Sequence, residues 1–137
     1  MNVVITLPQR LSQAIISGTK KIEMRKSNPK NLNAGIDGFF VIEKGSDNVV
    51  CWCRVSRINK IYLFNKQLRD WWYDTIGNDI CISREEFHAY CRTTDIMYLW
   101  IIDKTIKFSP NLHKSDLIID KNPQSYCYAP LSYGESF

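Results

Sequence analysis

Residues 18–25, with the sequence G-T-K-K-I-E-M-R, constrain the fold most, because the hydrophobic period of the chain changes at Gly18. Ahead of them, Leu11, Ala14 and Ile15 have the spacing of a helical apolar stripe, and Gly18 is placed to end that helix. Beyond the glycine, apolar and charged residues alternate with period two, which predicts a β-strand. We therefore expect the chain to pass from a helix directly into a strand.

The predicted strand, residues 21–26, concentrates its charge on one face. Its two apolar residues point toward a core, and the opposite face carries Lys21, Glu23 and Arg25. Lys20 stands just before them, at the mouth of the turn. Two interpretations stay open for this face: a pocket that clamps a ligand, or a solvated surface with an ion pair worth ~0–1 kcal/mol.

The net charge of +4 is located almost entirely around this strand. Residues 1–30 hold six basic residues against one acidic residue, 6 − 1 = +5, and the remaining residues hold 12 basic and 13 acidic residues, 12 − 13 = −1. Such a concentration is typical of a site for a polyanion, most often a nucleic acid. A solvated basic face without a partner explains the charge alone equally well.

The rest of the chain predicts more strands than helices. The expected strands cover residues 2–7, 38–43, 49–61, 95–109 and 126–128, and the expected helices cover residues 8–18, 65–77 and 83–92. Residues 27–35 predict a polar loop, 117–119 a brief pairing, and 134–137 a loose end. The strands follow one another in hairpin-like order. We expect a single α+β domain over residues 1–137: a small, mostly antiparallel β-barrel with two or three helices packed around it.

Two local patterns carry further expectations. Leu68, Trp71 and Trp72 form a helical stripe that we expect to be core and not a platform for stacking bases. Pro110 and Asn111 are expected to end the longest strand, whose two largely apolar faces suit the centre of a closed sheet.

Composition favours a cytoplasmic protein without a cofactor, metal or membrane partner. No apolar run approaches the ~18 residues that a membrane span needs, and the first ten residues lack the features of a signal peptide. The five cysteines include no C-x-x-C pair, and neither His88 nor His113 has a partner at ligand spacing. Cys51 and Cys53 flank Trp52 in a predicted strand, and we expect both to be buried, reduced thiols on the face opposite Trp52.

Residues 18–25 resemble the G-x-K-x-x-E-x-R signature of the ASCH domain, a branch of the PUA-like barrels. Residues 3–17 resemble the strand and helix that precede this signature in the family. S-R-E-E-F-H-A-Y at residues 83–90 is similar to the S-x-x-E-F-x-x-Y segment, and K-N-P-Q-S-Y at residues 121–126 resembles the P-Q-S-aromatic closing motif of one subgroup. The resemblance is weaker over residues 27–80. It implies a PUA-like β-barrel beside a cleft lined by the motif strand.

The resemblance implies RNA or nucleic-acid binding for many members, hydrolysis of acetylated cytidine for one bacterial branch, and ribonuclease activity for others. Fold alone does not choose among these activities. The hydrolysing branch has a threonine nucleophile where this chain has Glu23, and a carboxylate cannot replace that hydroxyl. In an enzyme, Glu23 would instead act as a general base for water, with Lys20 as its electrophilic partner.

The favoured interpretation is a cleft that binds nucleic acid, with RNA or a modified nucleotide as the partner. Arg25 and Lys20 suit phosphate, and Glu23 could hold Arg25 in place or accept hydrogen bonds from the amino edge of a base. The expected ligand-binding residues are Lys20, Lys21, Glu23, Arg25, Gln124, Ser125 and Tyr126.

Two other functions stay open. The first is a hydrolase acting on acylated nucleosides or RNA in the same cleft, with Lys20 and Glu23 as catalytic residues, or with Lys20 and Ser125 in a ribonuclease. Residues 123–125 can equally be a turn that satisfies backbone groups. The second is a protein-interaction adaptor that docks its partner through exposed aromatics such as Tyr73.

Overall fold

The computed structural model describes residues 1–28 and 36–129, and within them six strands form one sheet that packs against three α-helices. The elements are β1 (Asn2–Leu7), α1 (Gln9–Ile16), β2 (Ile22–Arg25), β3 (Gly38–Glu43), β4 (Asn48–Tyr62), α2 (Lys66–Ile80), α3 (Arg84–Cys91), β5 (Ile96–His113), the 3-10 helix η2 (Lys114–Leu117) and β6 (Cys127–Tyr128). The expected α+β class is confirmed. The predicted loop at residues 27–35 and the predicted loose end at 134–137 lie largely or wholly outside the described residues.

The sheet is open, so the expected closed barrel is wrong. Its strand order is β2-β5-β4-β3-β1-β6, and neighbours are antiparallel except for the parallel pair β1 and β3. Closure would require the edge strands β2 and β6 to pair, but β6 is only two residues long. A side chain spans the gap instead: the Arg25 guanidinium, at the end of β2, donates a hydrogen bond to the Ser125 carbonyl just before β6.

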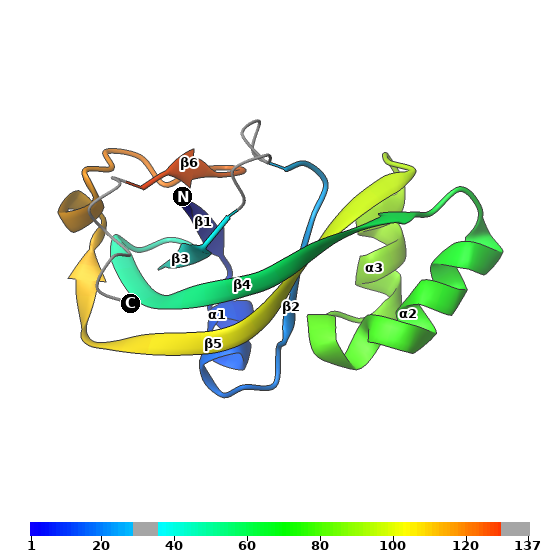
Figure 1. The fold of residues 1–137 in the computed structure, drawn as a ribbon, viewed down its shortest axis with the longest axis horizontal. Helices are drawn as coiled ribbons and strands as arrows, with labels where there is room; N and C mark the ends of the chain where they lie inside the picture. Colours follow the sequence, from blue (N-terminus) through cyan, green and yellow to red (C-terminus); the bar gives the residue numbers. More distant parts are fainter. Residues whose placement is uncertain (29–35, 130–137) are drawn as a thin grey trace.

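Strands β4 and β5 run side by side along the molecule, from the end with β1, β3 and β6 to the end with α2 and α3 (Figure 1). β5 continues past its predicted end, through Pro110, to His113. The register between the two strands shifts between Val49 and Cys51, opposite this part of β5. A proline is tolerated at such an irregularity because the ladder does not need its missing N–H there. η2 follows directly and ends at Leu117, and the structure assigns no strand at residues 117–119, where a brief pairing was predicted.

Three groups of buried side chains make up the core. One face of the sheet packs on α1 through Ile15, Phe39 and Trp100, and the opposite face carries a second group that includes Trp52. Cys51 and Cys53 belong to the first group, so their predicted burial on the face opposite Trp52 is confirmed. The third group joins β2 and the far part of β4 and β5 to α2 and α3, at the right-hand end of Figure 1.

Helix α2 corrects two expectations. It runs past Gly77 to Ile80, because Gly77 makes room for the Tyr73 ring: a Cβ at Gly77 would lie 2.9 Å from that ring. The buried residues of α2 are Ile76 and Ile80. The stripe predicted to be core is not fully buried, and Trp71 is 55% exposed.

Helix α3 begins with a capping box, whose S-x-x-E pattern stands in the sequence at residues 83–86. The Ser83 hydroxyl accepts a hydrogen bond from the Glu86 N–H at 3.1 Å, and the Glu86 carboxylate accepts one from the Ser83 N–H at 3.1 Å. Phe87 and Cys91 are its buried residues. The helix therefore places Glu86 and Tyr90 at fixed positions beside β2.

We expect Ser83→Ala to lower the free energy of unfolding by ~1 kcal/mol, because the Glu86 N–H loses its capping acceptor. Ser83→Thr, which keeps the hydroxyl, is the matched control and should stay close to the parent. Urea unfolding followed by circular dichroism measures both variants. Equal stability of the alanine variant and the parent would show that the cap contributes nothing.

Candidate functional site

A pocket of about 280 Å³ opens where β2 meets α1 and the α2–α3 pair. Its walls are mainly apolar, and charged groups from β2, α1 and α3 converge on it. The lining residues are Leu7, Pro8, Arg10, Leu11, Lys20, Glu23, Met24, Arg25, Ile80, Ile82, Glu86 and Tyr90. An apolar cavity with a few convergent polar groups is the usual form of a small-molecule site.

Lys20 follows the turn after α1, as predicted, and is buried at the bottom of this site. Gly18 ends α1 with φ +83, as predicted, and so aims the next residues back under the helix. The Lys20 Nζ donates to the carbonyls of Ile22 and Ile80 and lies 3.5 Å from a carboxylate oxygen of Glu23. Three acceptors therefore surround the three ammonium hydrogens.

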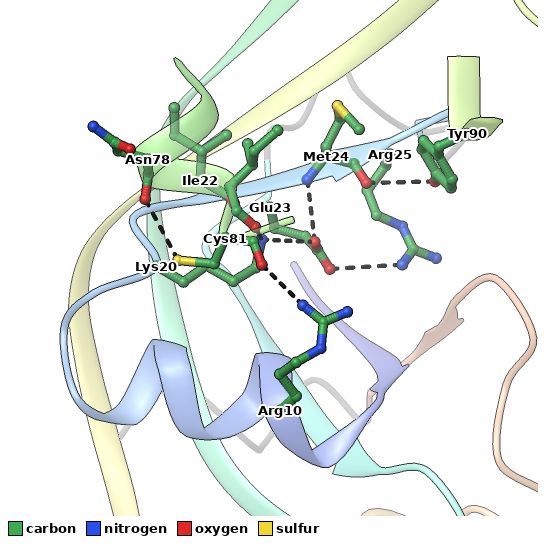
Figure 2. Close-up of polar contacts among 10 residues, drawn as sticks. Arg10, Lys20, Ile22, Glu23, Met24, Arg25, Asn78, Cys81 and Tyr90 are labelled. Carbon is green, nitrogen blue, oxygen red and sulfur yellow. Dashed lines mark hydrogen bonds and ion pairs between the residues drawn. The ribbon is translucent and has the colours of Figure 1, made fainter. Parts of the chain in front are cut away.

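Glu23 is the central group of the site. It is 3% exposed, which contradicts the interpretation of a solvated strand face. Its Oε1 accepts the Met24 N–H at 3.1 Å and faces Lys20. Its Oε2, 3.7 Å from the Arg25 guanidinium, has no hydrogen-bond partner among the residues that the structure describes. We call this atom the acceptor oxygen. Figure 2 shows the carboxylate between the lysine and the arginine.

Arg25 is the last residue of β2. Its side chain is 13% exposed, and one guanidinium nitrogen faces the acceptor oxygen of Glu23 while another donates to the Ser125 carbonyl. The guanidinium is thus held from two sides, and its planar fork is oriented before any ligand arrives.

Arg10 and Glu86 were not among the predicted site residues, although both line the pocket. Arg10 projects from α1 and donates to the Cys81 carbonyl at 3.0 Å and to Glu86 at 2.9 Å (Figure 2 shows the first of these). The backbone N–H of Ser83, in the capping box, holds the pKa of Glu86 below its usual value, and Arg10 adds to this effect. The capping box was visible in the sequence, but its pairing with a residue 76 positions away was not.

Tyr90 forms part of the wall beside Arg25. Its hydroxyl lies 3.5 Å from the Met24 carbonyl, and the Lys26 Nζ lies 4.5 Å from the centre of its ring. Burial raises the pKa of Tyr90, and Glu23 adds to the rise while Arg25 opposes it. The ring is half-buried, and its exposed part can contact a ligand.

The structure does not bring every predicted site residue to this pocket. Lys21 is exposed and is not among the described residues that line it. Gln124 lines a separate hollow with Thr6 and Lys44. Ser125 contributes its carbonyl to Arg25, and Tyr126 packs against the first core group. The closing motif therefore does meet β2, through its backbone.

Over residues 1–28 and 36–129, the structure shows no cluster of three or more His, Cys, Asp or Glu residues that could hold a metal ion. The five cysteines, all within these ranges, are free thiols. In the same ranges we find no helix with the length and apolarity needed to cross a membrane.

The fold, an open six-stranded sheet of the described residues with α1 packed on one face and α2 and α3 at one end, is that of an ASCH domain. The ASCH protein from Zymomonas mobilis superposes with a TM-score of 0.78, covering 96% of this chain and 89% of that protein at 15% sequence identity. A serine-to-alanine and a tyrosine-to-phenylalanine variant of it superpose with TM-scores of 0.76 and 0.77, at 16% and 15% identity.

These two variants cover 95% of this chain, which spans 89% and 91% of them. No family model and no curated protein sequence matches the chain. The predicted ASCH resemblance is thus confirmed for the fold, and what the pocket does rests on its own chemistry.

Proposed function

We propose that this protein binds RNA, or a single nucleotide, in the pocket around Glu23. The observation that carries the proposal is the acceptor oxygen: a buried oxygen of the Glu23 side chain at a pocket wall, which lies between Lys20 and Arg25 and has no hydrogen-bond donor among the described residues. Leaving such an atom without a donor costs free energy, so the site favours a ligand that brings one.

The amino edge of a nucleobase is a donor of this kind. Carboxylates accept hydrogen bonds from the cytosine N4 amino group, and the apolar walls and the Tyr90 ring offer surfaces for the base. The Arg25 fork and, at the mouth, Arg10 suit a phosphate. In this proposal the base is bound by Glu23, and the phosphate is bound by Arg25 and Arg10.

The size of the pocket limits what enters it. Its volume of about 280 Å³ is close to the lower end of the range of ~300–1,000 Å³ typical for small-molecule sites. This space suits one nucleoside unit, and a base within a duplex is not available to enter it. The proposed form of RNA is accordingly single-stranded, with one base turned out of the stack.

A hydrolase is the second candidate function, favoured by the same oxygen of Glu23, which could take a proton from a water molecule beside a bound nucleotide. The three acceptors around the Lys20 ammonium fit a role in holding Glu23 in place better than a role as an electrophile. An enzyme at this site would thus use Glu23 as its base.

Titration of the parent protein with a short single-stranded RNA tests the binding proposal. We expect the affinity to fall steeply as salt is raised from about 50 to about 200 mM, because phosphate contacts release counterions. The same RNA in a fully paired duplex should bind more weakly. Equal binding of both forms, or no binding of either, would contradict the proposal.

Chromatography after incubation with acetylcytidine or labelled RNA decides the second candidate. Turnover by the parent that Glu23→Gln abolishes, with the fold intact by circular dichroism, would establish a hydrolase. Binding without turnover would leave the protein a binding module.

A further inference from the structure

We propose that single-stranded RNA, held in the pocket by one nucleotide, continues over an exposed strip of aromatic and basic residues on the far part of β4. This inference rests on the proposed function and adds a second contact region to it. The strip consists of Lys60 and Tyr62, at the end of β4, and Phe64, two residues beyond it; we call it the β4 strip.

Within the β4 strip, Lys60 and Tyr62 lie on the sheet face that α2 and α3 leave uncovered, and Phe64 follows just past the end of the strand. Ile61 and Leu63 alternate with them along the chain and are buried against these two helices. Because neighbouring residues of a strand point to opposite faces, Lys60 and Tyr62 point away from the helices. The right-hand end of Figure 1 shows this part of β4 and β5 beside α2 and α3.

The strip is connected to the pocket across the sheet. Arg25 on β2 is directly opposite Tyr98 on β5, and Tyr98 is directly opposite Lys60 on β4. Residues opposite one another share a face, so these three form one row, with Arg25 and Lys60 roughly 10 Å apart at strand spacing. Tyr62 follows two residues farther along the same face. The row leads from the phosphate-binding end of the pocket to the strip.

The side chains of the strip are arranged for stacking. The Tyr62 and Phe64 rings lie 5.3 Å apart with 28° between their planes, and the Lys60 Nζ lies 5.5 Å from the centre of the Tyr62 ring. Tyr62 is 44% exposed and Phe64 is 62% exposed. Large aromatic side chains left exposed next to a cation are the usual means by which proteins bind single-stranded nucleic acid without reading its sequence.

Charge favours RNA over an apolar protein segment at this surface. Lys60 lies over the ring that a base would approach, and Arg25 begins the row. Asp95 is an acidic residue close to the strip in the chain, because it precedes Ile96, which is opposite Tyr62. Its side chain is on the other face, toward α2, where a carboxylate oxygen lies 3.8 Å from the Arg69 guanidinium. A phosphate along the row would therefore meet cations.

Fluorescence anisotropy with two probes tests the inference: a single-stranded RNA of about eight nucleotides and a cytidine monophosphate analogue that carries a fluorophore. We expect Phe64→Ala to weaken binding of the RNA about fivefold to a hundredfold, the effect of one lost stacking contact, and to leave binding of the mononucleotide unchanged. Trp71→Ala is the matched control, because Trp71 is also a largely exposed aromatic residue, 55% against 62% for Phe64, but lies on α2. Its affinity for both probes should equal that of the parent.

The outcomes separate this inference from the proposed function. If the parent binds neither probe, the proposed function fails and the inference fails with it. If the parent binds the mononucleotide and Phe64→Ala binds the RNA as tightly as the parent does, the pocket stands and the β4 strip is overturned. An equal loss in Trp71→Ala would also overturn it, because the effect would not belong to the strip.

Discussion

Replacing Glu23 by leucine should lower the free energy of unfolding by ~3–5 kcal/mol, because Lys20 would keep a buried positive charge with no acid beside it. Lys20→Met should cost a similar amount, since it leaves Glu23 buried without its nearer cation. Urea unfolding measures both losses, provided that the slope with denaturant stays the same. We expect either loss of stability to exceed that of Ser83→Ala severalfold.

The double variant Lys20→Met/Glu23→Leu is the control that separates charge from packing. With both charges gone, nothing ionised stays in the bottom of the pocket, and stability should return to within about 1–2 kcal/mol of the parent. This variant should nevertheless fail to bind nucleotide. Two results would contradict a coupled buried pair of Lys20 and Glu23. Each single variant could lower the free energy of unfolding by less than about 1 kcal/mol, or the loss in the double variant could equal the sum of the two single losses.

Arg25→Ala should weaken RNA binding about tenfold to a hundredfold, the effect of losing a charge-assisted hydrogen bond of ~1.5–3 kcal/mol to phosphate. The slope of log affinity against log salt should also fall by about one. Arg25→Lys keeps the positive charge but not the planar guanidinium fork, so its affinity for RNA should lie between those of the parent and Arg25→Ala.

Arg54→Ala is the matched control for this prediction. Arg54 is another arginine of the sheet, but it is paired with Asp103 on the surface and does not line the pocket in the described residues. Its removal should leave RNA affinity and the salt slope unchanged. If Arg25→Ala and Arg54→Ala lost affinity equally, RNA would be held by the general charge of the protein and not by the pocket.

The sequence predicts local structure well where the signal is local. The bounds of β1, the left-handed Gly18 and the capping box of α3 all follow from a few adjacent residues, and the structure confirms them. The open sheet was not predictable in this way, because closure depends on whether two edge strands far apart in the chain are long enough to pair.

In the candidate site, too, local sequence patterns were predictive and contacts between distant residues were not. The spacing of Lys20, Glu23 and Arg25 placed them together, but their burial depends on Ile80, which comes about 60 positions later and supplies an acceptor to Lys20. Gly77 resembles a helix end in the sequence, and only the packed structure shows the Tyr73 ring above it. The exposure of Trp71 has a similar origin: periodicity identifies an apolar stripe, but not what covers it.

Chemical shifts of the backbone amides during titration with cytidine monophosphate test the central claim most directly. The Met24 N–H donates to the Glu23 carboxylate, so it reports on any donor that reaches that group. We predict a saturable shift of the Met24 amide together with those of Ile82 and Tyr90, and no shift at Cys127 on the far edge strand. Binding that shifts amides elsewhere and leaves Met24 unmoved would contradict the account.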